Sequence, residues 1–172
     1  WTLMHGVMWI AILPELALAL GAAAVLLVEV QWKPLARTLG IIGALAILLA
    51  GAFSVVQWFQ ASDANAIGAG FDLIAFSGMI VMDGFAVFGR VALLAITGLG
   101  LMAGWKYVEG LGRRGAEAIA LVLLATAGFS IMVAANNLVM MFLGLEVGSI
   151  ALYVLAGLTG ERTKADEAAL KY

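Results

Sequence analysis

The stretch Leu138-Val-Met-Met-Phe-Leu-Gly-Leu-Glu-Val-Gly-Ser-Ile-Ala-Leu-Tyr-Val-Leu-Ala-Gly-Leu158 is long enough to cross a membrane as a helix, and Glu146 is its only charged residue. A carboxylate at the bilayer centre costs about 2.5–3.5 kcal/mol even on lenient insertion scales, so such residues are rare. An acid that persists there is usually used by the protein. Glu146 is therefore a candidate for proton or ion handling.

Two hydroxyl residues follow Glu146 at helical spacing. Ser149 lies three residues further on and Tyr153 four beyond that, which places all three on one stripe of a helix. Such a stripe can relay protons through hydroxyls and ordered water, so Ser149 and Tyr153 are possible relay residues. The alternative is that Glu146 hydrogen-bonds a neighbouring helix and only fixes packing.

A possible basic partner, Lys171, lies in the last segment, 163–172, whose composition predicts the start of a further helix. An adjacent ammonium favours the charged form of Glu146 whereas burial disfavours it, so the proton on Glu146 would respond to the position of the amine. The alternative is that Lys171 extends its ammonium to the membrane interface, and the sequence favours this almost equally.

The composition as a whole is that of an integral membrane protein. Apolar residues make up 65% of the 172 positions, charged residues 12%, and the mean hydropathy is +1.10, whereas soluble domains have about a quarter charged residues. The chain has no cysteine, and His5 has no ligand-spaced partner, so we expect no metal site. The net charge of −2, without a basic cluster, does not indicate nucleic-acid binding.

The hydropathy pattern predicts an all-α integral membrane fold, a polytopic bundle of five complete transmembrane helices plus the start of a sixth. We expect residues 1–172 to form a single transmembrane domain that is the N-terminal part of a larger subunit. About 20 apolar residues span the hydrocarbon as a helix. The segments that qualify are Val7–Val28, Leu39–Trp58, Gly84–Ala103, Ala118–Ala135 and Leu138–Leu158.

Lysine and arginine alternate between the loops and predict the orientation. They occur in loops 29–38, 104–117 and 159–165, which we therefore place in the cytoplasm, with the N-terminus outside. Loop 60–82 has no lysine or arginine before the next span and is expected outside. Within this loop, 71–82 has the partial alternation of an extended hairpin. Between the last two spans, Asn136-Asn137 is expected to form a tight turn.

Two further intramembrane charges are weaker candidates for a site. Glu15, beside Pro14, is expected to be buried in helix packing or in polar contacts at the lipid interface, and a role in a proton path is the alternative. Arg90 lies seven positions after Asp83, so we expect an ion pair between them near the outer interface. Small residues at helix-contact spacing predict close helix packing in three places, namely Gly40 with Ala44, Gly100 with Gly104, and Gly144 with Gly148.

Taken together, these motifs resemble the subunit N family of bacterial proton-pumping NADH:quinone oxidoreductase, respiratory complex I, one of the antiporter-like membrane subunits. The resemblance covers the whole chain in topology, but its specific motifs lie in the last forty residues. The matching elements are Ala134-Ala-Asn-Asn-Leu-Val-Met-Met-Phe-Leu-Gly-Leu-Glu146, Ser149, Leu152-Tyr-Val-Leu155 and Glu167-Ala-Ala-Leu-Lys-Tyr172, with looser matches at Leu13-Pro-Glu-Leu16 and Val81-Met-Asp-Gly-Phe-Ala86.

The resemblance implies a proton-translocating subunit of a larger enzyme. Glu146 matches the family's key glutamate and Lys171 its lysine on the following helix, and a second half-channel would lie beyond Tyr172. No redox chemistry and no cofactor are expected in this chain, whereas NADH, FMN, iron–sulfur clusters and quinone would bind partner subunits. Other membrane-arm subunits and the lipid bilayer are the expected partners, in the bacterial inner membrane.

Two alternatives remain open at the level of sequence. One is an antiporter-like subunit of a cation/proton antiporter or of a membrane-bound hydrogenase, which would share the glutamate motif. The other is a structural or assembly subunit of the membrane without a transport role.

Overall fold

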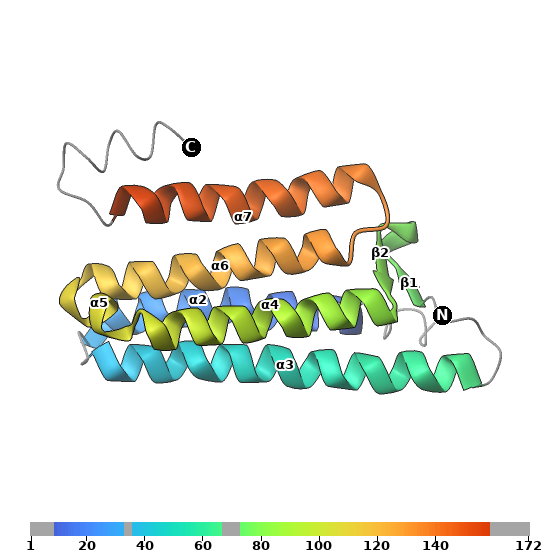
Figure 1. Cartoon of the computed structure of the whole chain (residues 1–172), viewed down its shortest axis with the longest axis horizontal. Helices are drawn as coiled ribbons and strands as arrows, with labels where there is room; N and C mark the ends of the chain where they lie inside the picture. Colours follow the sequence, from blue (N-terminus) through green and yellow to red (C-terminus); the bar gives the residue numbers. More distant parts are fainter. Residues whose placement is uncertain (1–8, 33–35, 67–72, 159–172) are drawn as a thin grey trace.

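The described part of the protein is a bundle of long, apolar helices. This computed structural model describes residues 9–32, 36–66 and 73–158. Five helices in these ranges are long and apolar enough to cross a membrane, and they lie side by side (Figure 1). The expected all-α membrane fold is therefore confirmed. The helices are α2 (Leu13–Trp32), α3 (Ala36–Ala66), α4 (Gly84–Ala103), α6 (Arg114–Val133) and α7 (Leu138–Leu158).

Several helix bounds differ from the prediction for local reasons. Residues 9–11 are helical, but a turn at Ile12 separates them from α2, which begins at Leu13, because Pro14 has no N–H to continue the helix from the preceding residues. The predicted start at Val7 lies outside the described residues. α3 runs on to Ala66, past the end of its apolar stretch, so part of loop 60–82 is helical. The loop at 104–117 contains a short helix, α5 (Trp105–Gly110), that hydropathy does not signal. The sixth helix that we expect at 163–172 lies outside the described residues.

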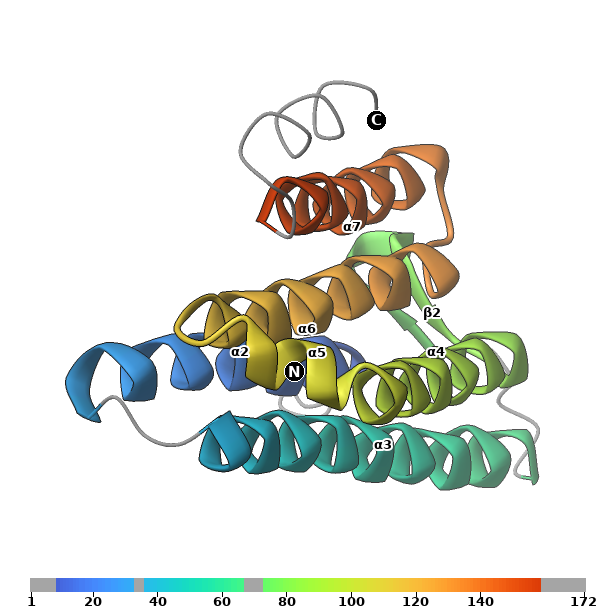
Figure 2. The same cartoon turned by 60° about the vertical axis from the view of Figure 1, so that its left-hand side comes forward.

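α6 is the central helix of the bundle. It packs against α2, α3, α4 and α7, and 56% of its span is buried, compared with 17% for α7. α7 lies along α6 at the edge of the bundle (Figures 1 and 2). Apolar side chains of α2, α3, α4 and α6 form the main core, which includes Leu18, Val25, Ala46, Leu94, Ile119 and Leu123.

Glycines bring α6 and α7 into backbone contact. A Cβ atom on Gly128 of α6 would lie 2.8 Å from the carbonyl oxygen of Gly144, and one on Gly144 would lie 2.6 Å from the backbone nitrogen of Met132. No real Cβ comes so close to backbone atoms, so only glycine permits this approach. The predicted contact role of Gly144 and Gly148 is confirmed, and Gly128 is their partner across the interface.

The other two small-residue pairs do not join helices in this way. A Cβ on Gly100 would meet no atom within 4 Å, and Gly104 follows the last residue of α4, so the prediction for this pair is wrong. Gly40 of α3 faces the indole ring of Trp105 rather than another helix backbone. Its missing side chain makes room for that ring.

A short hairpin covers one end of the bundle. Strands β1 (Leu73–Ala75) and β2 (Ile80–Met82) pair antiparallel around a 3₁₀ turn, η1 (Phe76–Gly78), in the segment where the sequence predicts an extended hairpin. The backbone N–H of Val81 donates to Ala134 at the end of α6, at 2.9 Å. The hairpin therefore holds the link between α6 and α7.

The two asparagines of that link do more than turn the chain. Asn136 donates from its backbone N–H to Met79 and from its side chain to Gly78, both at 2.9 Å. The side-chain oxygen of Asn137 accepts from the backbone N–H of Met140 at 2.8 Å, which is the geometry of a helix N-cap. The link between α6 and α7 is thus fixed by hydrogen bonds at both residues.

The α6–α7 contact yields a prediction with a matched control. Gly128→Ala should destabilise the fold by about 1–3 kcal/mol, because the added methyl group has backbone on the opposite side and nowhere to move. Gly100→Ala adds the same atoms to a helix with open space and should be neutral or slightly stabilising. Thermal unfolding in detergent measures both changes, and an equal effect of the two substitutions would contradict the close approach.

Candidate functional site

Glu146 lies near the middle of α7, on a side of the helix that α6 does not cover. Gly144, Gly148 and Ala151 are buried against α6. Glu146 is two residues from both glycines, so it points roughly 200° away from them around the helix. Its side chain is half-buried, and it forms no hydrogen bond or ion pair with another residue in the described part of the chain.

The predicted polar stripe on α7 is continuous and open. Ser149 is half-buried and Tyr153 is 39% exposed, on the same side of the helix as Glu146. The stripe therefore faces away from the four-helix core rather than into it. The predicted partner Lys171 lies outside the described residues, so its contact with Glu146 remains a prediction.

The other intramembrane acid, Glu15, is held in a closed polar cluster with Arg90. The Nε of Arg90 donates to Oε1 of Glu15 at 2.9 Å, and its Nη2 lies 2.8 Å from the same oxygen. The two residues are 5% and 1% exposed. The predicted ion pair of Arg90 with Asp83 is wrong, because Asp83 accepts the backbone N–H of Ala86 at 2.7 Å and caps α4 instead.

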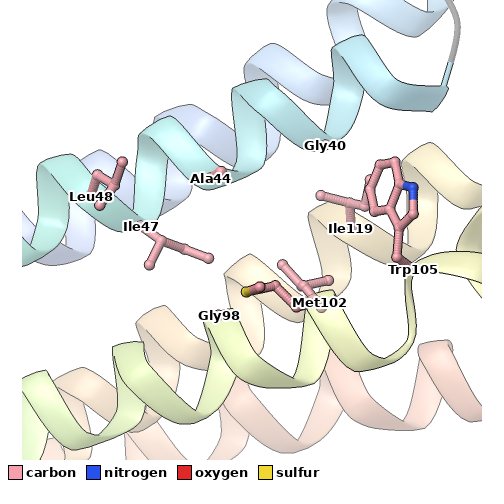
Figure 3. Close-up of a pocket in the computed structure, with 9 residues that line it drawn as sticks. Gly40, Ala44, Ile47, Leu48, Gly98, Met102, Trp105 and Ile119 are labelled. Atoms are coloured by element: carbon pink, nitrogen blue, oxygen red, sulfur yellow. The ribbon is translucent and has the colours of Figure 1, made fainter.

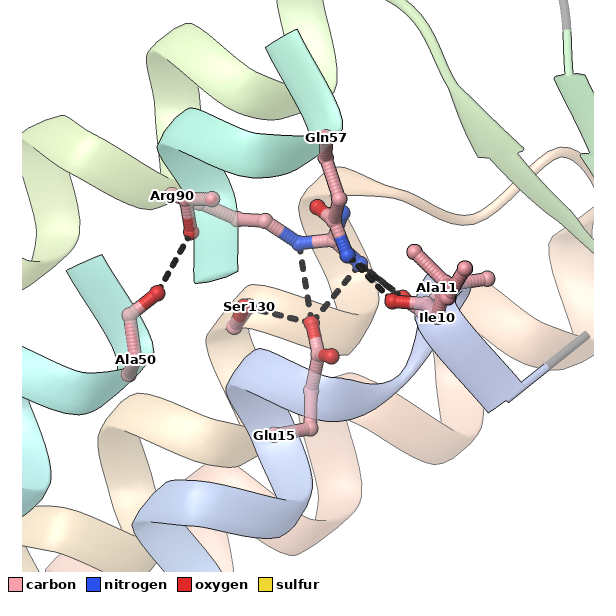
Figure 4. Close-up of polar contacts among 8 residues, drawn as sticks. Ile10, Ala11, Glu15, Ala50, Gln57, Arg90 and Ser130 are labelled. Carbon is pink, nitrogen blue, oxygen red and sulfur yellow. Dashed lines mark hydrogen bonds and ion pairs between the residues drawn. The ribbon is translucent and has the colours of Figure 1, made fainter. Parts of the chain in front are cut away.

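Gln57 of α3 completes the coordination of the guanidinium (Figure 4). Its Oε1 accepts from Nη1 of Arg90 at 2.8 Å, and its Nε2 donates to the carbonyl oxygen of Ile10 at 2.6 Å. That carbonyl is available because its helical donor would be the nitrogen of Pro14, which carries no hydrogen. Nη2 of Arg90 donates to the next carbonyl, that of Ala11, at 3.1 Å. The break before α2 thus supplies acceptors to the cluster.

Ser130 of α6 is the fourth member of the cluster. Its hydroxyl donates to Oε1 of Glu15 at 2.7 Å, so this one oxygen accepts from both Arg90 and Ser130. The other oxygen, Oε2, is buried and has no hydrogen-bond partner in the described part of the chain. The cluster of Glu15, Gln57, Arg90 and Ser130 therefore ties together α2, α3, α4 and α6 near the end of the bundle that carries the hairpin.

Comparison with known proteins places the chain in a family. Residues 135–172 match the family model described as "NADH:quinone oxidoreductase/Mrp antiporter, TM". The chain is 35% identical over 161 residues to NADH-quinone oxidoreductase subunit N of Parvibaculum lavamentivorans, an alignment that covers 93% of this chain and 31% of that protein. The subunit N of Erythrobacter litoralis is 37% identical, over 94% of this chain and 32% of that protein. The chain belongs to the NADH:quinone oxidoreductase subunit N family.

The chain spans about a third of the length of the subunit N relatives it matches. The family model begins at Ala135, so the matched residues include all of α7 with Glu146 and continue to Tyr172. The Glu15 cluster lies before this region, within the alignments to the subunit N relatives. Glu146 is therefore covered both by the family model and by the alignments to the subunit N relatives, whereas Glu15 is covered by those alignments and not by the family model.

The two acids have opposite environments, and this decides what each can do chemically. Glu15 is neutralised by a buried guanidinium and fixed by a hydroxyl, so it stabilises the bundle. Glu146 has no such partner in the described part of the chain and sits on an open polar stripe. Among the described residues, no group of three or more histidine, cysteine or acidic side chains is placed to hold a metal ion. Of these two acids, only Glu15 has a hydrogen-bond partner among the described residues.

The sequence reasoning missed Gln57 and Ser130, although a signal for them exists. Both are polar residues in otherwise apolar spans, and the alternating topology places both near the same ends of the helices as Glu15 and Arg90. Polar groups at one depth on different spans predict a shared cluster. A second missed pair, Thr97 of α4 and Thr126 of α6, joins those helices through hydroxyls 2.8 Å apart.

The cluster predicts a large loss of stability when one charge is removed. Arg90→Met should destabilise the fold by about 3–5 kcal/mol, because it leaves Glu15 buried with an unpaired charge. The double variant Glu15→Leu/Arg90→Met should recover most of the loss. Arg114→Met, at an exposed cation at the start of α6, is the control and should have almost no effect.

Thermal unfolding in detergent of the parent protein, Arg90→Met, Glu15→Leu and the double variant forms a double-mutant cycle, and Arg114→Met is measured beside it. If Arg90→Met is no more harmful than Arg114→Met, or if the double variant loses as much as the sum of its parts, the cluster does not hold the helices together.

Proposed function

We propose that this chain is the N-terminal part of a subunit N that takes part in proton translocation by an NADH:quinone oxidoreductase. In this proposal Glu146 accepts and releases a proton within the membrane, and electron transfer occurs in other subunits. The enzyme activity thus belongs to the whole complex.

The observation that carries the proposal is the environment of Glu146. It is an acid in the middle of a span, within the region that matches the family model, on a side of α7 left open by α6. A purely structural acid is expected to find a buried donor, as Glu15 does with Arg90. Glu146 has none in the described part of the chain, which favours exchange of its proton over a packing role.

Lys171 is the proposed partner of Glu146, and Ser149 and Tyr153 are proposed relay residues. A charged lysine on a neighbouring helix would stabilise the carboxylate of Glu146 when the two groups are close. This stabilisation would be lost when the amine is distant or neutral. The proton on Glu146 would then follow the charge of the amine. The hydroxyls of Ser149 and Tyr153, on the same stripe, would carry the proton with ordered water toward the end of α7 at Leu158.

The remaining features of the proposal come from the relatives and from the charge pattern. The relatives are named as subunits of NADH-quinone oxidoreductase, so other membrane-arm subunits are the proposed partners. NADH, FMN, the iron–sulfur clusters and quinone are proposed to bind other subunits of the complex and not this chain. The chain crosses a membrane several times. We propose that this membrane is the bacterial inner membrane. Loops 29–38, 104–117 and 159–165 are placed in the cytoplasm because these loops carry the cations.

Two other functions are less well supported. The family model also describes antiporter subunits, but the relatives quoted above are named for the oxidoreductase. A purely structural role would be expected to give Glu146 a fixed partner. Nothing in the described residues provides one.

The test is Glu146→Gln in the complete subunit within its membrane complex. We expect proton pumping driven by NADH to fall several-fold, while the complex still assembles, because glutamine keeps the shape but cannot carry the proton. Proton uptake into inverted membrane vesicles, divided by the rate of NADH oxidation, is the measurement. Glu117→Gln, an exposed acid in the first turn of α6, is the control and should leave the ratio unchanged.

Lys171→Ala extends this test to the proposed partner. It should also lower the ratio of protons to electrons, but less than Glu146→Gln does. Normal pumping by Glu146→Gln in an assembled complex would contradict the proposal and favour a structural role.

A further inference from the structure

An apolar groove opens between α3 and α4 at the end of the bundle opposite the hairpin. Its volume is about 500 Å³, and it is lined by side chains of α3, α4 and α6 and by Trp105 of α5. Figure 3 shows Ile47 of α3, Met102 of α4 and the indole of Trp105 directed toward the space between the helices. Every lining residue is apolar, so the groove suits a hydrocarbon chain.

The groove exists because small residues face it and because Trp105 closes one end. Gly40 and Ala44 on α3 and Gly98 on α4 leave the space unfilled. A Cβ on Gly98 would meet no atom within 4 Å, whereas a Cβ on Gly40 would overlap the ring of Trp105. The indole N–H of Trp105 donates to Glu109 at 2.8 Å, which fixes the ring as an end wall.

Two cations, Arg37 and Lys106, belong to the helix segments that form the closed end of the groove. Arg37 is in the first turn of α3, three residues before Gly40, so it lies on the side of the helix that lines the groove. Lys106 follows Trp105 directly. Both side chains are exposed, and neither forms an ion pair among the described residues. The start of α3 and α5 lie at the same end of the bundle (Figure 1).

Acidic residues also lie at this end, namely Glu29, Glu109 and the exposed Glu117, but none of them forms an ion pair with Arg37 or Lys106 among the described residues. Glu109 accepts from Trp105, and Glu29 lies 3.8 Å from the guanidinium of Arg113. Arg37 and Lys106 therefore remain available to a negatively charged group. A tryptophan at the same level is typical of the membrane interface, where lipid headgroups lie.

We propose that the groove between α3 and α4 binds an anionic phospholipid. One acyl chain would lie along Ala44, Ile47 and Met102, and the phosphate of the headgroup would accept hydrogen bonds from Arg37 and Lys106. The lipid belongs to the leaflet on the side of these cations. An apolar slot that ends at the interface between cations is the arrangement by which membrane proteins hold anionic lipids.

The charges favour a lipid over another transmembrane helix as the occupant. A helix placed in the groove would bury the apolar walls equally well, but it would leave the two cations without an anion. A phospholipid satisfies both parts of the site with a single molecule. Its acyl chain matches the apolar walls of the groove, and its phosphate matches Arg37 and Lys106.

The test is photo-cross-linking with lipids in the complete membrane complex. The complex is reconstituted in phosphatidylcholine vesicles that contain either phosphatidylglycerol or phosphatidylcholine with a diazirine in one acyl chain. After illumination, labelled peptides are identified by mass spectrometry. We expect the peptide with Met102 and Trp105 to be labelled several-fold more by the phosphatidylglycerol probe than by the phosphatidylcholine probe.

Two variants and an internal control make the result specific. Arg37→Gln/Lys106→Gln should bring the ratio of the two probes close to one, and Ala44→Phe should remove labelling by filling the groove. The peptide with Phe88, exposed near the other end of α4, should be labelled equally by both probes. No labelling at Met102 and Trp105 would mean that protein covers the groove, and equal labelling would mean ordinary solvating lipid; either result overturns the proposal.

Discussion

The buried ion pair between Glu15 and Arg90 is the constraint on which the bundle depends. Charged side chains buried between membrane spans are tolerated only when each is paired and hydrogen-bonded. Gln57, Ser130 and the carbonyl oxygen of Ala11 supply the additional bonds to the two charges. Four helices thereby meet at one point near the hairpin end. Any shift of one helix would break a bond to a buried charge, so their relative positions are fixed.

The position of α7 follows from this arrangement. Ser130, which donates to Glu15, lies two residues after Gly128, whose missing side chain admits the backbone of α7. The hairpin fixes the link between α6 and α7 from the same end. Glu146 therefore projects from a helix that is held on one side by backbone contact, and its own side remains open. The fold fixes the position of Glu146 without engaging its carboxylate.

Hydropathy and helical spacing predict much of this structure, because both act within single segments. The five spans and the stripe of Glu146, Ser149 and Tyr153 can be found in this way. The partner of Arg90 cannot, because Glu15 is 75 positions away and hydropathy does not say which helices are neighbours. Asp83 is nearer in sequence, but the free N–H groups at the start of α4 engage it as a cap.

Glu15 is held by a buried cation, whereas the proposed function requires Glu146 to exchange its proton. A hydrophobic carbodiimide distinguishes them, since it modifies protonated carboxyl groups within the membrane. After treatment of the intact complex in membranes, peptide mass spectrometry locates the modified residues. We predict modification at Glu146 and none at Glu15. Modification of Glu15, or protection of Glu146 from the reagent, would contradict the account.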